Sequence, residues 1–154
     1  MILNPEHMML DKMTPAIFKK ARIELRRSLK ALDETRKVLP YNFELSLVLT
    51  EIQLVTELMV LISKLGQFLC MHIKNGGSGD QRSAFSTAHA GVVNLPMTVR
   101  TDLANSLLTI RSKFQHTWLS RNIASTLPNA LKMFDNLFRA LLPPSMQDLG
   151  KQLL

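Results

Sequence analysis

The stretch FELSLVLTEIQLVTELMVLISKLGQFLCMHI, residues 43–73, is the most apolar part of the chain and decides its fold. Its apolar side chains cover most of the circumference of a helix, and such a helix is packed against several neighbours. We therefore expect a helix over residues 42–74, roughly 50 Å long at about 1.5 Å per residue. Because the preceding helix alone cannot cover it, we expect the later helices to enclose it as the central element of the structure.

The polar residues of this stretch form a narrow stripe. Ser46, Thr50, Gln53, Glu57, Lys64 and Gln67 recur at helical spacings of four, three, four, seven and three. We interpret the stripe as solvated or as a polar contact between helices. Although the stretch is long enough to cross a bilayer, charges such as Glu51, Glu57 and Lys64 are costly in hydrocarbon, so we expect no membrane span.

The residues before this stretch predict a second helix over about Pro15–Val38. Thr14 offers a hydroxyl N-cap, and Pro15 suits the first helical position, where its missing N–H costs nothing. Pro40 disfavours helical backbone at Leu39 and ends the helix. Apolar residues at helical spacing form one face of it. Residues 14–74 are thus expected to form a helical hairpin.

Residues 75–80, with Gly76, Gly77 and Gly79 around Ser78, have the composition of a flexible linker. We interpret them as an engineered joint, which either replaces a trimmed loop or fuses two partner chains. A natural flexible loop is the alternative. Nothing functional is assigned to this segment.

The second half of the chain, residues 83–154, predicts shorter helices over about 84–93, 98–126, 128–142 and 145–153, with Thr98 as one N-cap. No segment alternates with the period of a strand. The predicted fold is therefore all-α: a single domain over residues 1–154, built as a helical bundle of five to six helices around the long central hydrophobic helix.

Composition narrows the class of protein. The chain has 154 residues, of which 46% are hydrophobic and 20% charged, so it can form its own core. A single cysteine, Cys70, excludes an internal disulfide framework and a multi-cysteine zinc module. No signal-peptide pattern is present at the N-terminus, and we expect an intracellular location, nucleus or cytoplasm. The net charge of +7 favours acidic partners.

Signatures of catalysis are missing from the sequence. It has no phosphate-binding loop, no dinucleotide fingerprint and no metalloprotease or nucleophile-elbow motif. The four histidines, His7, His72, His89 and His116, lie far apart, so no metal site is predicted. We expect no enzyme activity, no cofactor and no small-molecule substrate.

Two groups of residues are candidate binding surfaces. The first is the basic face of the 15–38 helix, which favours an acidic protein or nucleic acid unless it is an ordinary solvated face. Its residues are Lys19, Arg22, Arg26, Arg27, Lys30 and Lys37.

The second group is apolar and lies near the C-terminus: Leu141, Leu142, Met146, Leu149 and Leu153. These side chains either bind a partner groove or fold back on the chain's own bundle. Together the patterns favour a non-catalytic protein–protein interaction or scaffold domain of a larger intracellular complex. A basic helical nucleic-acid-binding domain is the alternative.

Overall fold

The computed structural model describes residues 13–75, without the side chains of 72–75, and residues 92–142. The described residues form four α-helices: α1 (Pro15–Val38), α2 (Phe43–Asn75), α4 (Met97–Leu119) and α5 (Leu127–Leu141), the last preceded by the short 3₁₀ helix η3 (Ala124–Thr126). The all-α bundle with a long central helix is therefore confirmed. The predicted helices 84–93 and 145–153 and the linker 75–80 lie almost wholly outside the described residues.

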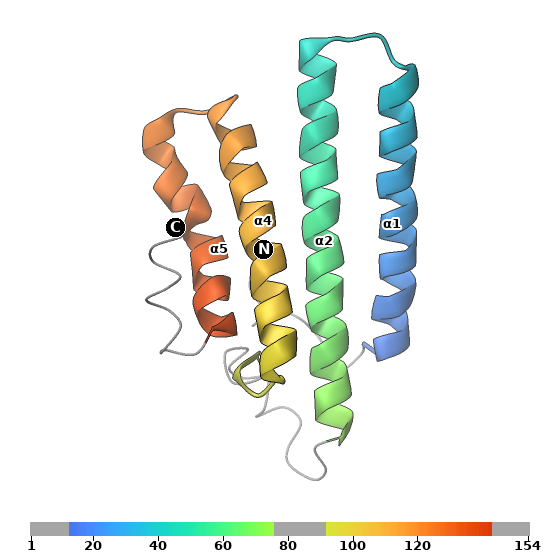
Figure 1. Ribbon diagram of the computed structural model, residues 1–154, viewed down its shortest axis with the longest axis vertical. Coiled ribbons are helices and arrows are strands. Elements are labelled where there is room, and N and C mark those ends of the chain that lie inside the picture. Colours follow the sequence, from blue (N-terminus) through green and yellow to red (C-terminus); the bar gives the residue numbers. More distant parts are fainter. Residues whose placement is uncertain (1–12, 76–91, 143–154) are drawn as a thin grey trace.

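The four helices stand in a row, α1 beside α2, α2 beside α4 and α4 beside α5 (Figure 1). Each helix packs mainly on its neighbour in the chain, and α2 is the tallest and lies between α1 and α4. The hairpin of α1 and α2 extends beyond α4 and α5 at one end. Because α2 lies inside the row, it has a neighbouring helix on each of two sides.

The start and end signals of α1 act as the sequence predicts. Thr14 Oγ1 accepts a hydrogen bond from the backbone N–H of Ile17 at 3.3 Å, and Pro15 occupies the first turn. Leu39 is extended, with φ −81° and ψ 140°, as expected before Pro40. The next helix begins directly after Asn42, whose Oδ1 accepts from the N–H of Leu45 at 2.9 Å. These local bonds satisfy backbone donors that a helix start leaves free.

The boundaries of α4 differ from those predicted. Thr98 is not the N-cap, because the helix begins one residue earlier, at Met97, directly after Pro96. The helix also ends at Leu119 instead of near residue 126. At its end the backbone N–H groups of Ser120 and Arg121 donate to carbonyls three residues back, those of Thr117 and Trp118, at 3.3 and 3.1 Å. The side-chain Nδ2 of Asn122 also donates to the carbonyl of Trp118, at 3.1 Å, and so helps to satisfy the end of the helix.

One core runs through α2, α4 and α5. The ring of Phe134 in α5 lies 5.0 Å from that of Phe114 in α4, and Leu107 of α4 is fully buried. From α1, Phe18 joins the same cluster. The other large apolar side chains of the core are Leu54, Leu61, Leu65, Leu69, Val92, Leu95, Leu103, Ile110, Leu131, Leu137, Phe138 and Leu141.

Two lines of buried side chains on α2 identify its packed sides. Leu49, Thr56, Ser63 and Cys70 are buried at intervals of seven residues, and the thiol of Cys70 contacts the carbonyl of Met13 at 3.9 Å. This line therefore faces α1. Leu54, Leu61 and Leu65 belong to the core shared with α4 and α5. The two neighbours of α2 lie on roughly opposite sides of it.

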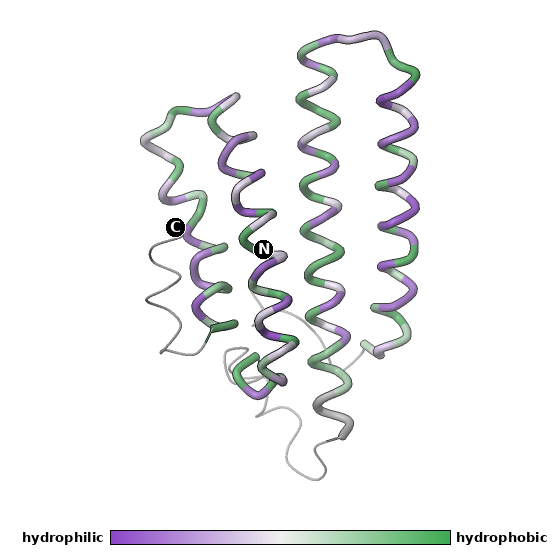
Figure 2. The backbone as a smooth tube through the Cα atoms, in the orientation of Figure 1, coloured by the Kyte–Doolittle hydropathy of each residue, from purple (hydrophilic) through white to green (hydrophobic). Residues whose placement is uncertain are grey.

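The expectation that other helices enclose α2 is wrong for the part of the chain that the structure describes. Val48, Ile52, Val55 and Met59 are 40–51% exposed, and we call these four residues the apolar strip. Apolar residues extend along the whole described length of α2 (Figure 2), but only 17% of its most apolar window is buried. A helix in a row has neighbours on two sides only, which leaves its other two faces open.

Candidate functional sites

Ion pairs join α2 to α4 along one open face, and we call them the polar seam. Lys113 Nζ lies 2.8 and 2.7 Å from the two carboxylate oxygens of Glu57, and Lys64 pairs with Asp102 further along. The polar stripe predicted on this helix thus forms contacts between helices, on the side away from the apolar strip.

Arg121, just beyond the end of α4, makes a separate contact with α2, because its Nε lies 2.7 Å from Glu51 Oε1. Glu51 comes three residues after Val48 and four before Val55, so this ion pair lies beside the apolar strip.

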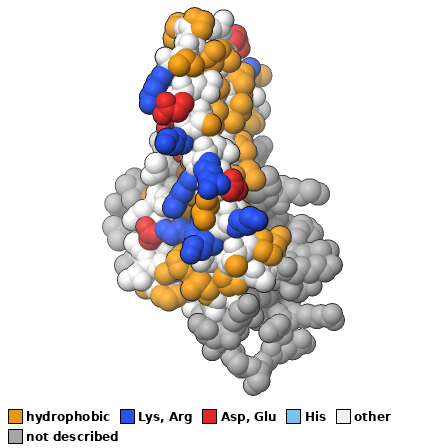
Figure 3. Space-filling view, turned by 90° about the vertical axis from the view of Figure 1, so that its right-hand side faces the viewer, with side chains coloured by type: hydrophobic (Ala, Val, Ile, Leu, Met, Phe, Trp, Pro, Cys, Tyr) orange, Lys and Arg blue, Asp and Glu red, His pale blue; other side chains and the backbone are white. Residues whose placement is uncertain are grey.

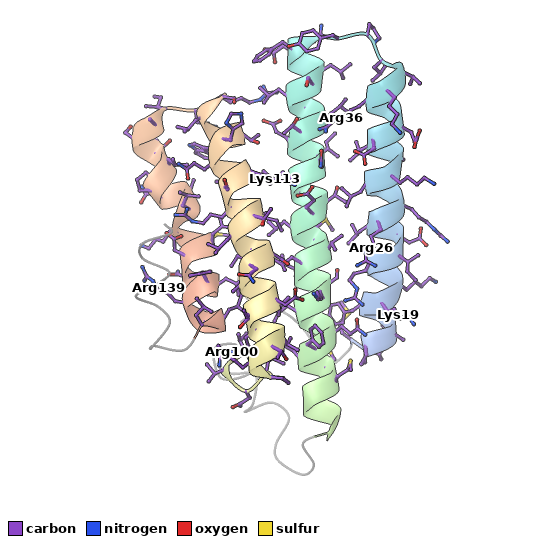
Figure 4. All side chains as sticks on the ribbon, viewed as in Figure 1. Lys19, Arg26, Arg36, Arg100, Lys113 and Arg139 are labelled. Atoms are coloured by element: carbon purple, nitrogen blue, oxygen red, sulfur yellow. The ribbon has the colours of Figure 1, made fainter. Side chains whose placement is uncertain are left out.

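A pocket of about 430 Å³ opens at the Glu57–Lys113 end of the polar seam. Lys113, labelled in Figure 4, lies at this pocket beside Glu57, which also accepts a hydrogen bond from Gln53 Nε2 at 2.8 Å. His116 is exposed at the same wall. The pocket is lined by Thr50, Gln53, Leu54, Glu57, Ser112, Lys113, His116 and Thr117. Its volume suits a small molecule, but its charged groups already bond one another.

The predicted basic face of α1 is exposed, but some of its cations form ion pairs with carboxylates of the same helix. Arg27 pairs with Glu24 at 2.7 Å and Lys37 with Glu34 at 3.3 Å. By contrast, Lys19, Arg26 and Lys30 are exposed and form no ion pair with a described carboxylate. Figure 3, which views the molecule from the side of α1, shows Lys and Arg side chains spread over this helix with few acidic ones between them.

Two other arginines of α1 reach back to α2. Arg22 donates to the side-chain carbonyl of Gln67, and Arg36 Nη2 donates to Thr50 Oγ1 at 3.2 Å (Figure 4). Burial lowers the pKa of Arg22, and the nearby charge of Arg26 lowers it further. Arg22 therefore acts mainly in packing the hairpin, and it is less available to a partner than the sequence suggested.

The predicted apolar group near the C-terminus is split by the structure. Leu141 is 1% exposed and belongs to the core, so it contacts its own chain and offers no surface to a partner. Leu142 is half-buried and packs against the same core. Met146, Leu149 and Leu153 lie outside the described residues. For Leu141 and Leu142 the alternative, burial within the chain, is therefore the observed arrangement.

Sequence reasoning missed two buried arginines of α4. Arg100 donates from Nε to the carbonyl of Leu141 at 2.7 Å and from Nη1 to that of Val93 at 3.2 Å. Arg111 Nε lies 2.8 Å from Asp135 Oδ1 of α5, and its side chain is 10% exposed. The sequence contained a signal for both, because Arg100 and Arg111 share helical spacing with the buried Leu103 and Leu107.

Among the residues that the structure describes, no group of three or more His, Cys, Asp or Glu side chains is placed to hold a metal ion. One described helix, over Phe43–Met71, is long and apolar enough by length and composition to cross a membrane. Within it, Glu57 and Lys64 form ion pairs with α4, and Glu51 pairs with Arg121 just beyond the end of α4.

Comparison with known proteins identifies no relative. No protein-family model matches the chain, and neither the curated proteins nor the solved structures contain a match.

Proposed function

We propose that the chain is a non-catalytic interaction or scaffold module of a larger protein assembly inside the cell. The observation that carries this proposal is the apolar strip, with Val48, Ile52, Val55 and Met59 each 40–51% exposed on one helix. The largest exposed apolar patch of a folded protein is often a site of interaction.

The polar groups of the described core support the same proposal, because they serve the fold. Arg100 is bonded to backbone carbonyls and Arg111 to a carboxylate, and described buried side-chain polar atoms all have a hydrogen-bond partner. Both arginines of α4 thus hold α5 against α4.

The test is purification of the tagged full-length protein from its source cells, with mass spectrometry of the proteins that accompany it. We expect the Val55→Glu variant to lose partners that the wild type retains, because a charge in the apolar strip opposes burial. Asn136→Glu, which adds the same charge at an exposed position of α5, is the matched control and should retain them. An unchanged partner set for V55E, in a protein with wild-type helical content, contradicts the proposal.

Nucleic-acid binding through α1 is the second candidate function. Its support is the set of exposed cations Lys19, Arg26 and Lys30, which form no ion pair with a described carboxylate, together with the net charge of +7. The test is titration with duplex and single-stranded DNA and RNA at two salt concentrations. Contacts with phosphates release counterions, so binding must weaken steeply with salt. Absence of binding, or binding that does not respond to salt, excludes this candidate.

A further inference from the structure

The positive charge of α1 is concentrated in the first part of the helix. Residues 19–30 contain six basic residues and one acidic residue, Glu24, whereas residues 31–38 contain two of each kind. We call residues 19–30 the basic segment, and its cations are Lys19, Lys20, Arg22, Arg26, Arg27 and Lys30. The segment spans roughly 17 Å of helix. It therefore carries a dense local charge, and this charge does not depend on the balance of the rest of the chain.

The basic segment is open on the side away from α2. Among the described helices, α1 stands at the end of the row and packs mainly on α2 (Figure 1). Lys19, Arg26 and Lys30 are exposed and follow one another at spacings of seven and four, so they lie along one side of the helix. Lys20 and Arg27 are exposed beside them, and Figure 3 shows Lys and Arg side chains gathered on this side. The segment thus presents a cationic surface along one helix.

This arrangement of cations is unfavourable in the free protein. Arg22, Arg26 and Lys30 follow one another at intervals of four residues, a spacing at which like charges on a helix repel. Burial lowers the pKa of Arg22, and the charge of Arg26 lowers it further. The helix dipole stabilises cations only near a C-terminus, so it does not compensate for this repulsion. A polyanion bound along the segment would relieve it.

The residues among the cations indicate which polyanion fits. The basic segment contains no aromatic residue, so it offers no platform on which the bases of a single strand could stack. Interfaces between proteins are depleted in lysine, whereas protein–DNA interfaces are strongly positive. The exposed side of one helix fits the major groove of B-form DNA, which is about 12 Å wide, but the major groove of an RNA duplex is deep and narrow. Duplex DNA is therefore favoured.

We propose that the basic segment of α1 binds the phosphate backbone of duplex DNA without reading its sequence. This inference rests on the second candidate function, nucleic-acid binding, and names the form of nucleic acid and the residues that bind it. Contacts with phosphates position a protein on DNA but carry no sequence information. The segment also lacks Asn and Gln, the side chains that pair with adenine. Affinity should therefore depend on charge and salt.

The experiment measures the fluorescence anisotropy of a labelled DNA duplex titrated with the full chain, between about 50 and 200 mM NaCl. Lys19→Gln, Arg26→Gln and Lys30→Gln each remove one cation from the segment. Lys132→Gln removes one exposed cation from α5 and is the matched control. We expect each segment variant to weaken binding about threefold or more, and to reduce the slope of log affinity against log salt by about one. The control should change neither, and Glu24→Gln should tighten binding because it removes the only carboxylate of the segment.

Each other outcome overturns the inference. Equal or tighter binding of single-stranded DNA, or of duplex RNA of the same sequence, excludes duplex DNA as the ligand but leaves nucleic-acid binding standing. Unequal affinities for two duplexes of unlike sequence exclude recognition of the backbone alone. Equal losses in K132Q and K19Q, with wild-type circular dichroism spectra, place the contacts outside the basic segment.

The failure of the broader functions gives a different result. Absence of binding to every nucleic acid, including any case in which only vesicles of anionic lipid bind, overturns this inference together with the second candidate function. The interaction function is judged separately by the partner set of V55E, because that variant leaves the basic segment unchanged.

Discussion

The ring of Phe18 in α1 lies in the space that a side chain on Gly66 of α2 would need. A Cβ atom on Gly66 would come within 2.6 Å of both Cε1 and Cζ of that ring. Phe18 is itself buried, so the ring has little room to move. Gly66 weakens the helix relative to alanine, but it allows α1 and α2 to approach closely where Phe18 enters the core.

Replacing this glycine should destabilise the protein. Gly66→Ala gains about 1 kcal/mol of helix propensity and loses about 1–3 kcal/mol to overpacking. We expect a net loss of about 1 kcal/mol, or a Tm lower by about 2–4 °C for a domain of this size. In a Phe18→Leu background, the same change should be neutral or stabilising, because a shorter side chain frees the space. Equal losses of unfolding free energy in both backgrounds, measured with denaturant, would show that the Phe18 ring is not the cause of the destabilisation.

Arg100 fastens the C-terminal end of α5. The residue is 8% exposed, and its guanidinium donates to the carbonyls of Leu141 and Ala140, at 2.7 and 3.4 Å, where the helix dipole is negative. Arg100→Met leaves these buried carbonyls without donors, so we expect a loss of about 2–3 kcal/mol. Lys132→Met on the exposed side of α5 should change the free energy of unfolding by less than about 0.5 kcal/mol. Urea titration of both variants tests the difference, and similar effects would contradict it.

The two ion pairs of Asp135 and Asp102 should differ in how much they stabilise the folded protein. Asp135 pairs with Arg111, and the side chains are 23% and 10% exposed, whereas Asp102, which pairs with Lys64, is 61% exposed. Asp135→Asn should cost about 2–4 kcal/mol, because it leaves a buried guanidinium without its counter-charge. Asp102→Asn should cost at most about 1 kcal/mol, and 1 M NaCl should reduce that cost. A salt-sensitive effect of D135N as small as that of D102N would contradict this ranking.

The two halves of the chain should depend on each other for folding. Leu54, Leu61 and Leu65 of α2 share one core with Phe134 and Phe138 of α5. Residues 1–75 and 80–154, expressed separately, should each unfold without a cooperative transition. Mixing them should restore helical circular dichroism and a sharp melting curve. If each half is folded and monomeric alone, the shared core is not required and the single-domain interpretation is wrong.

Local signals in the sequence predicted the helical elements well. Thr14, Pro15 and Pro40 act through their own backbone and nearest neighbours, so the bounds of α1 are as predicted. The apolar circumference of α2 likewise predicted its central position. The end of α4 was misplaced, because the apolar residue Ile123 continues the helical pattern past Leu119, whereas the backbone there closes with bonds to carbonyls three residues back.

The candidate sites could not be predicted as fully, because they depend on contacts between residues that are distant in sequence. Val55 and Leu54 are adjacent and equally apolar, and only the placement of α1, α4 and α5 determines that one is exposed and the other buried. Arg100 finds its acceptors about 40 residues later in the chain, at the end of another helix. The exposure of Lys19 and Lys30 could be predicted, because one amphipathic helix suffices to determine it.

The described helices stand side by side and not around a closed ring, and this arrangement determines where further helices can pack. In a closed ring every helix packs against two neighbours. In the open row of the described helices, the two terminal helices, α1 and α5, each pack mainly on one neighbour. Among the described residues, a helix added beside α1, beside α5 or across the exposed face of α2 would break no contact inside the row. The described row could therefore be extended without being rebuilt.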